Sequence, residues 1–140
     1  MGHDGAMTTS NEQPEPRAIF GAREVRELQS LARDVLCGEH LLRFVAELLQ
    51  ATQPAPDADE ETRRFVRYGA SPRAGQAIVL TAKVRALLDV RPSVAREDLD
   101  ASLIPALRHR VVLTFDAEAD GRTVDALARN WVDTAARRAK

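Results

Sequence analysis

The sequence predicts an all-α fold, a small bundle of about four to five helices that leaves room for one short β pairing. Its 140 residues suit one domain with a loose end. Hydrophobic residues make up 44% of the chain but aromatic residues only 4%, so the core must consist mainly of Leu, Val, Ile and Ala packed between helices. Apolar residues also recur at spacings of three and four along most of the chain, which is the period of amphipathic helices.

The chain divides into a leader and a helical domain. Residues 1–17 are polar, lack periodicity and are rich in Gly, Pro, Ser and Thr, so we expect a disordered leader, tag or linker there. A second methionine, Met7, sets residues 1–6 apart as an added leader. The helical domain is expected at residues 18–140.

Two amphipathic helices open the domain, the first from Arg23 to about Leu36 and the second from Glu39 to about Ala51. Their apolar stripes are Val25, Leu28, Ala32 and Val35 in the first helix, and Leu41, Leu42, Val45, Leu48 and Leu49 in the second. Gly38 ends the first helix and leaves only a tight turn, so we expect the two helices to pack against each other. A surface linker rich in proline and acidic residues follows.

The third helix has the clearest start. The segment RRFVRY at 63–68 precedes it and is predicted either as a strand or as an extended lead-in. Ser71 supplies an N-cap hydroxyl and Pro72 occupies the first helical position, so the helix is predicted to run from there to Asp89. We expect it to be the most buried element, with a core face of Ala77, Leu80, Val84 and Leu87 and with Ile78 and Leu88 beside it.

The last third of the chain predicts two more helices. Acidic residues after Arg96 mark the start of a fourth helix, which Pro105 is expected to kink. Residues 111–115 are apolar and β-branched, so helix and strand both stay open there, and residues 116–121 are predicted as an acidic turn. Thr123 is expected to cap the last helix. The predicted core residues are Leu99, Leu103, Ile104 and Leu107 in the fourth helix, and Val124, Leu127, Trp131 and Val132 in the last.

Charge and missing motifs exclude several classes of function. The formal net charge is −1, and most arginines alternate with acids, so Arg33, Arg43, Arg64, Arg85 and Arg129 are predicted to be solvated helix faces. A helix-turn-helix DNA reader is therefore disfavoured, and neither nucleic acid nor a membrane is expected as a partner. The chain also lacks a phosphate-binding loop, so it cannot hydrolyse a nucleotide alone.

No metal or thiol chemistry is predicted. His40 and His109 are far apart in the sequence and indicate no metal site. Cys37 is the single cysteine and is predicted to be a small apolar residue at a helix end. A lone cysteine with no signal peptide predicts a reduced, cytoplasmic protein.

The segment YGASPR at 68–73, followed by AGQAIVLTAKVRALLDVR, resembles the lid domain of MoxR-family AAA+ ATPases. In that family a long lid helix opens with Gly-Ala-Ser-Pro-Arg and continues into Ala-Lys-x-Arg-Ala, which is present here at 82–86. VAREDL at 94–99 and LRHRV at 107–111 are similar to two further stretches of the family's lid. The resemblance extends from about Glu24 to Ala128.

The resemblance implies a role for Arg73, which occupies the position of the sensor 2 arginine that reaches the γ-phosphate of ATP. It places Ser71, Pro72 and Arg73 on the phosphate side of the nucleotide. A capped helix start favours an anion and a guanidinium can hold two phosphate oxygens at once, so the physical chemistry of these residues agrees. Local pattern alone favours an exposed arginine at a helix start, and the resemblance reverses this preference.

Two departures from the family pattern affect capping and the linker surface. Ala95 stands where Ser or Thr would cap the fourth helix, and Gln53 replaces a basic residue after the second helix. His109 and Arg110 form a second candidate site, for which helix-end side chains that satisfy terminal carbonyls are the simpler interpretation.

The resemblance implies a lid that closes over ATP and Mg²⁺ held by a missing AAA+ core of the same protein. It further implies a homo-oligomeric ring that couples hydrolysis to subunit motion, and a chaperone whose clients include proteins with a von Willebrand A domain. The alternative is a free-standing helical adaptor that keeps the lid fold without ATPase function. Arg73 after Ser71-Pro72 favours the lid, because an adaptor has no need of it.

Overall fold

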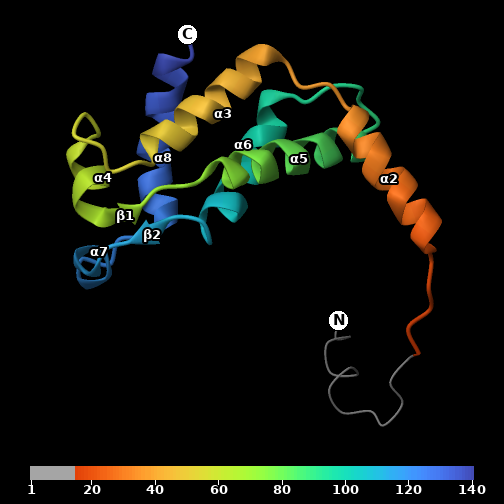
Figure 1. The fold of residues 1–140 in the computed structure, drawn as a ribbon, viewed down its shortest axis with the longest axis horizontal. Helices are drawn as coiled ribbons and strands as arrows, with labels where there is room; N and C mark the ends of the chain where they lie inside the picture. The colour runs from red at the N-terminus through yellow and green to blue at the C-terminus, as the bar shows by residue number, and fades with distance from the viewer. Residues whose placement is uncertain (1–14) are drawn as a thin grey trace, which may run out of the picture.

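The computed structural model describes residues 15–140 and confirms the all-α prediction (Figure 1). Most of the predicted leader therefore lies outside the described residues. The elements are α2 (Ala22–Asp34), α3 (Glu39–Ala51), α4 (Glu60–Phe65), β1 (Val66–Tyr68), α5 (Pro72–Leu88), α6 (Arg96–Leu107), β2 (Val112–Leu113), α7 (Phe115–Ala119) and α8 (Val124–Arg138). Within the described residues, no helix has both the length and the apolar composition that a membrane crossing requires.

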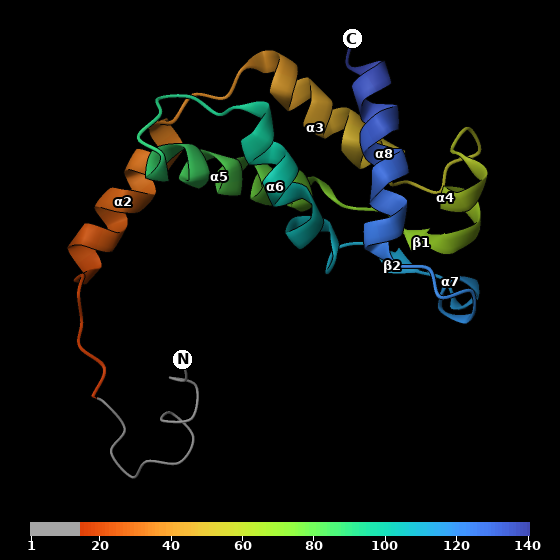
Figure 2. The same cartoon turned by 180° about the vertical axis from the view of Figure 1, so that it is seen from behind.

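Four helices, α3, α5, α6 and α8, build the core. α5 packs along α6, and α3 packs along both α8 and α5. The largest side chains that solvent does not reach come from all four helices, and they include Leu48, Ile78, Leu99, Leu107, Leu127 and Trp131. Both views show α2 at one end of this bundle and the small sheet with α4 and α7 at the other (Figures 1 and 2). The core is mainly aliphatic, as the composition predicts, and its aromatic members are Phe44, Phe65 and Trp131.

The short β pairing is present and resolves both ambiguous segments. β1 and β2 are antiparallel, with Val66 opposite Leu113 and Tyr68 opposite Val112. Of residues 111–115 only Val112–Leu113 form a strand, since Thr114 and Phe115 begin α7, and 63–68 is the end of α4 followed by a strand. The predicted acidic turn at 116–121 is wrong in part, because the short helix α7 forms there. Its start is capped by Thr114, whose Oγ1 accepts a hydrogen bond from the Ala117 N–H at 3.3 Å.

The predicted packing of the first two helices is wrong. α2 contacts α5 instead of folding back on α3. The reason is the connection at 35–38, which is extended rather than a tight turn, since Val35 has ψ 129° and Gly38 has ψ 145°. Leu36 bonds to the turn before α6, donating to Pro92 O at 3.0 Å and accepting from Val94 N at 2.8 Å. Of the predicted stripe only Ala32 and Val35 are buried, while Val25 and Leu28 stay exposed.

The third helix is continuous as predicted, but its buried face differs from the prediction. Small residues dominate that face, which consists of Ala74, Gly75, Ile78, Ala82 and Ala86. Leu80, Val84 and Leu88 of the predicted core are exposed. Small side chains let α6 and α3 approach the axis of α5 closely, so this helix meets its neighbours through its least bulky side.

The fourth and last helices follow the prediction closely. Leu99, Leu103 and Leu107 are buried in α6 and Ile104 is partly buried, and Pro105 lies exposed two residues before the helix ends. α8 begins after Thr123, whose Oγ1 accepts from the Ala126 N–H at 3.2 Å. Its buried face holds Val124, Leu127 and Trp131, with Val132 partly buried. The Trp131 indole N–H donates to Thr62 Oγ1 at 2.8 Å, which joins α8 to α4 through a buried hydrogen bond.

Candidate functional site

The Arg73 side chain lies exposed in the first turn of α5. Within residues 15–140, its guanidinium makes no ion pair and no hydrogen bond, whereas many other arginines are paired with acids. A guanidinium is a strong donor that folded proteins usually pair when an acid is within reach. Arg73 is therefore left free to meet a group outside the described domain.

The start of α5 is arranged for an anion. Ser71 is the N-cap residue with an extended backbone, but its hydroxyl makes no capping hydrogen bond, which corrects the prediction that it would. Pro72 at the first helical position has no N–H to satisfy. The positive end of a helix of 17 residues and the exposed Arg73 side chain thus belong to the same turn. N–H groups of a helix start and a guanidinium are both groups that favour phosphate oxygens.

A clamp from the end of α3 holds the backbone just before Ser71. Thr52 is fully buried, and its Oγ1 accepts from the Ala70 N–H at 2.9 Å while donating to Leu49 O at 2.7 Å. The Gln53 amide donates to Ala70 O at 2.9 Å. Both polar groups of the Ala70 backbone are therefore held by two consecutive residues of another segment.

Gly69 allows this clamp to close. A Cβ at this position would lie 2.7 Å from the backbone oxygen of Thr52 and 2.7 Å from the Gln53 amide carbon, closer than atoms can approach. The contact between the two segments thus requires a residue without a side chain. In the sequence, Gln53 stands out only because it replaces a basic residue of the family pattern. The spacing of 17 and 18 residues to Ala70 gives no sequence signal of the contact.

A bidentate ion pair fixes the other end of α5 to α6. Arg91 Nη1 donates to Asp98 Oδ2 at 2.8 Å and Arg91 Nη2 to Asp98 Oδ1 at 2.7 Å. Asp98 Oδ2 also accepts from the Ala95 N–H at 2.8 Å, which is the half of a capping box that needs no side chain from Ala95. The hydrogen bonds from Arg91 hold the pKa of Asp98 below its usual range, despite the burial of the carboxylate. This pair sets the direction in which α6 leaves α5.

Of the second candidate pair, His109 and Arg110, only Arg110 has a structural role. Arg110 Nη1 donates to Ala106 O at 3.0 Å, which confirms that this side chain satisfies a carbonyl at the end of α6. His109 is exposed and makes no side-chain hydrogen bond in the part of the chain that the structure describes. The two residues therefore form no joint site.

The remaining side chains singled out by the sequence lie away from Arg73 or have a structural role. The arginines predicted to be solvated are all exposed, which confirms that interpretation for Arg33, Arg43, Arg64, Arg85 and Arg129. Cys37 is partly buried, and burial raises the pKa of its thiol although Lys83 opposes the shift. Such a thiol is neutral and unreactive. Across the described residues, no group of His, Cys, Asp and Glu could hold a metal ion.

The chain is similar to known proteins over most of this region. The model of the AAA lid domain family matches residues 58–131, more than half of the chain. Chaperone MoxR1 of Mycobacterium tuberculosis is 32% identical over 108 residues, which cover 76% of this chain and 29% of that protein. Protein MoxR of Paracoccus denitrificans is 33% identical over 103 residues, which cover 67% of this chain and 30% of that protein.

A solved structure gives the same result for the fold. A crystal structure of a protein from Cytophaga hutchinsonii, described as an ATPase, is similar with a TM-score of 0.74 at 29% identity. The match covers 80% of this chain and 34% of that one. The chain thus spans about a third of the length of the proteins that it matches.

Proposed function

We propose that this chain, which belongs to the AAA lid domain family as the lid of a MoxR-type AAA+ ATPase, brings Arg73 to the γ-phosphate of ATP. In this role Arg73 acts as the sensor 2 residue, and Ser71 and Pro72 lie on the phosphate side. One observation carries the proposal. A guanidinium without a partner in the described domain lies at the open positive end of a long helix, in the motif that the family uses for this contact.

The geometry of the site supports a contact that is specific and rigid. The clamp on Ala70 restrains the residue that precedes the N-cap, so the start of α5 cannot swing freely. A rigid helix transmits a movement at its N-terminus along its length, and the Arg91–Asp98 pair couples its far end to α6. A change at the γ-phosphate could then rotate the lid as one body, which is how hydrolysis would be coupled to motion between subunits.

The nucleotide must come from the rest of the parent protein. The chain has no phosphate-binding loop, so we propose that ATP and Mg²⁺ are held by a AAA+ core domain and that the lid closes over them. Ile19 and Phe20, exposed by 85% and 60% before α2, are apolar residues that contact with such a core would cover. We further propose that the parent forms a homo-oligomeric ring whose clients include proteins with a von Willebrand A domain.

The proposal is tested by Arg73→Ala in a parent protein that carries this lid on its core. A charge-assisted contact of this kind contributes about 1.5 to 3 kcal/mol, so kcat for ATP hydrolysis should fall by about tenfold to a few hundredfold if the contact is made in the transition state. The circular dichroism spectrum should stay unchanged, because the exposed Arg73 side chain makes no hydrogen bond or ion pair within residues 15–140.

Arg85→Ala is the matched control, since Arg85 is another exposed arginine of α5, three turns further along the helix. It should hydrolyse ATP as fast as the unmodified protein. Equal rates for Arg73→Ala and the unmodified protein would remove the sensor 2 assignment and favour the adaptor. Steady ATP turnover by the isolated 140-residue chain would also contradict the proposal.

A further inference from the structure

The bulky apolar side chains of α5 lie on the side that the bundle leaves open. The helix packs into the core through small residues, whereas Leu80 is 46% exposed, Val84 38% and Leu88 76%. These three residues are spaced by four, so they form one stripe along the helix. Exposing large aliphatic side chains in a row costs free energy that a partner surface could recover.

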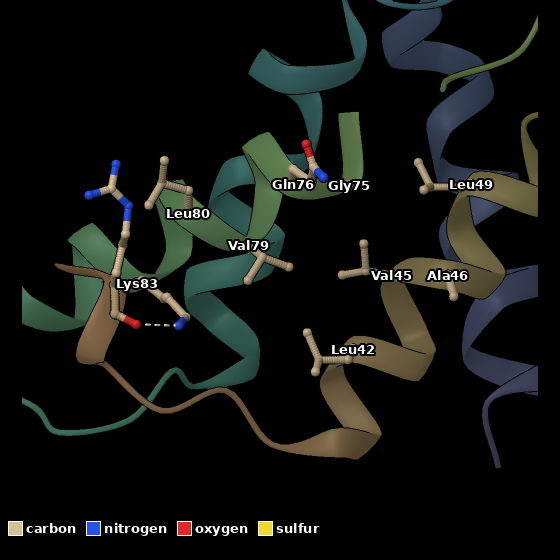
Figure 3. A pocket seen from close by; sticks show the side chains of 10 residues that line it. Leu42, Val45, Ala46, Leu49, Gly75, Gln76, Val79, Leu80 and Lys83 are labelled. Atoms are coloured by element: carbon tan, nitrogen blue, oxygen red, sulfur yellow. Dashed lines mark hydrogen bonds between the residues drawn. The ribbon is translucent and has the colours of Figure 1, made fainter. Parts of the chain in front are cut away.

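Two neighbouring helices turn this stripe into a groove. α3 lines one side with Leu42, Val45 and Leu49, facing Val79 and Leu80 of α5 across an open cavity of about 420 Å³ (Figure 3). α2 lines a second cavity of about 290 Å³, where Leu28 and Ala32 face Val84 and Leu88.

Leu80 and Arg33 line both cavities, so the two form one continuous strip, which we call the α5 groove. From Gln76 to Leu88 it extends about 18 Å, the length of roughly three helical turns.

The charges on the α5 groove all have one sign. Arg33 and Lys83 are the only charged residues that line either cavity, and no acid is among the lining residues. Lys83 Nζ donates to Arg33 O at 2.7 Å, which holds the ammonium near the middle of the groove, where α2 meets α5 (Figure 3). Neither cation has an ion pair among residues 15–140.

We propose that the α5 groove binds an amphipathic helix of a partner protein, with acidic side chains that pair with Arg33 and Lys83. The length of the strip suits three turns of helix, and its apolar floor suits side chains repeated every three or four residues. The two unpaired cations select acids over bases in the bound helix. None of the residues that line the groove belongs to the Arg73 site, so the two surfaces can be tested by separate substitutions.

Two synthetic peptides test this directly. Each is a fluorescein-labelled helix of about 18 residues with leucine at every third or fourth position, and the twins differ only in carrying glutamates or lysines beside the leucines. Fluorescence anisotropy with the 140-residue chain should show micromolar binding of the glutamate peptide, and binding of the lysine twin weaker by at least about tenfold.

Variants at the groove should separate the apolar from the charged contribution. Leu80→Gln should weaken binding of the glutamate peptide about tenfold. Lys83→Glu should reverse the preference, so that the lysine peptide binds more tightly than the glutamate peptide. Because Lys83 also bonds to α2, Arg33→Glu repeats the charge test at an exposed residue whose side chain makes no hydrogen bond or ion pair among the described residues. The control variant Arg129→Glu changes an exposed arginine on α8 and should bind like the unmodified chain, and so should Arg73→Ala.

Three outcomes would overturn the proposal. The first is equal binding of the two peptides, and the second is unchanged binding by Leu80→Gln and Arg33→Glu when circular dichroism shows both folded. The third is a dimer of the chain in sedimentation that Leu80→Gln dissolves and that excludes the glutamate peptide, because the groove would then be a contact between copies.

Discussion

Val90 has a backbone conformation that is unfavourable for a residue with a branched side chain. Replacing it with glycine should therefore stabilise the protein. Val90 follows the C-cap of α5 with φ 56°, in the left-handed region that a β-branched residue rarely adopts. Its N–H donates to Leu87 O at 2.9 Å and the next N–H donates to Ala86 O at 2.8 Å. This is the Schellman arrangement, in which glycine is the usual residue.

α7 ends in the same way with the usual residue. Gly121 has φ 65°, its N–H donates to Glu118 O at 3.1 Å, and the Arg122 N–H donates to Ala117 O at 2.8 Å. A Cβ on Gly121 would meet no atom within 4 Å, so only the backbone conformation distinguishes glycine from other residues there. The chain therefore contains the same turn with and without the side-chain penalty.

The magnitude follows from three terms. The left-handed conformation costs a residue with a Cβ about 1 to 2 kcal/mol, and Val90→Gly removes that cost. The added freedom of glycine in the unfolded chain returns about 0.5 to 1 kcal/mol of it. Val90 is 90% exposed, so almost no buried apolar area is lost. The variant should gain about 1 kcal/mol, or about 3 °C in Tm for a domain of this size.

Urea unfolding followed by tryptophan fluorescence measures this gain. Trp131 is the single tryptophan and is fully buried, so its emission reports loss of the core. Gly121→Val is the reverse substitution in the equivalent turn. It should lower the free energy of unfolding by about as much as Val90→Gly raises it. Val90→Gly with a midpoint equal to or below that of the unmodified chain would refute the reasoning.

Two further predictions concern the ends of α5. Asp98→Asn should cost about 1.5 to 3 kcal/mol at pH 7, because the charge-assisted bonds from Arg91 are lost. Since the pKa of Asp98 is lowered in the folded state, its stabilisation is present above the ordinary value near about 4 and is lost as pH falls through the lowered pKa. Urea midpoints between pH 7 and 3 should therefore fall more steeply below about pH 4 for the unmodified chain than for Asp98→Asn, and parallel curves would contradict this. Thr52→Val should leave the buried Ala70 N–H without an acceptor, cost about 1 to 3 kcal/mol and speed hydrogen exchange at that amide, whereas unchanged exchange would show that the clamp does not form.

Local signals in the sequence are enough to predict three of the helices. α3, α6 and α8 each begin at a residue that the pattern marks, and their apolar stripes turn inward except for Leu42, which is exposed. Thr123 shows why, since a cap and the periodicity that follows it are both local and neither depends on the rest of the chain. The position of Arg73 at a helix start follows from the same kind of signal.

Packing between elements could not be predicted in the same way. The direction of α2 depends on the bond between Leu36 and the turn before α6, which lies more than fifty residues away in the chain. The clamp on Ala70 likewise joins two segments by side-chain bonds that no periodic pattern encodes. Both features are set by tertiary contacts, and so was the choice of buried face on α5.

The mistaken face of α5 links the two proposals. The rule that large aliphatic residues mark the core holds for a domain that functions alone, and it fails here for Leu80, Val84 and Leu88. Arg73 precedes Leu80 by seven residues, two turns of helix, so it lies on the same open side of α5. One helix thus uses its small residues for its own fold and presents both a free cation and an apolar stripe outward. If both proposals hold, Leu80→Gln should weaken peptide binding about tenfold and leave hydrolysis in the parent unchanged, whereas Arg73→Ala should slow hydrolysis and leave peptide binding unchanged.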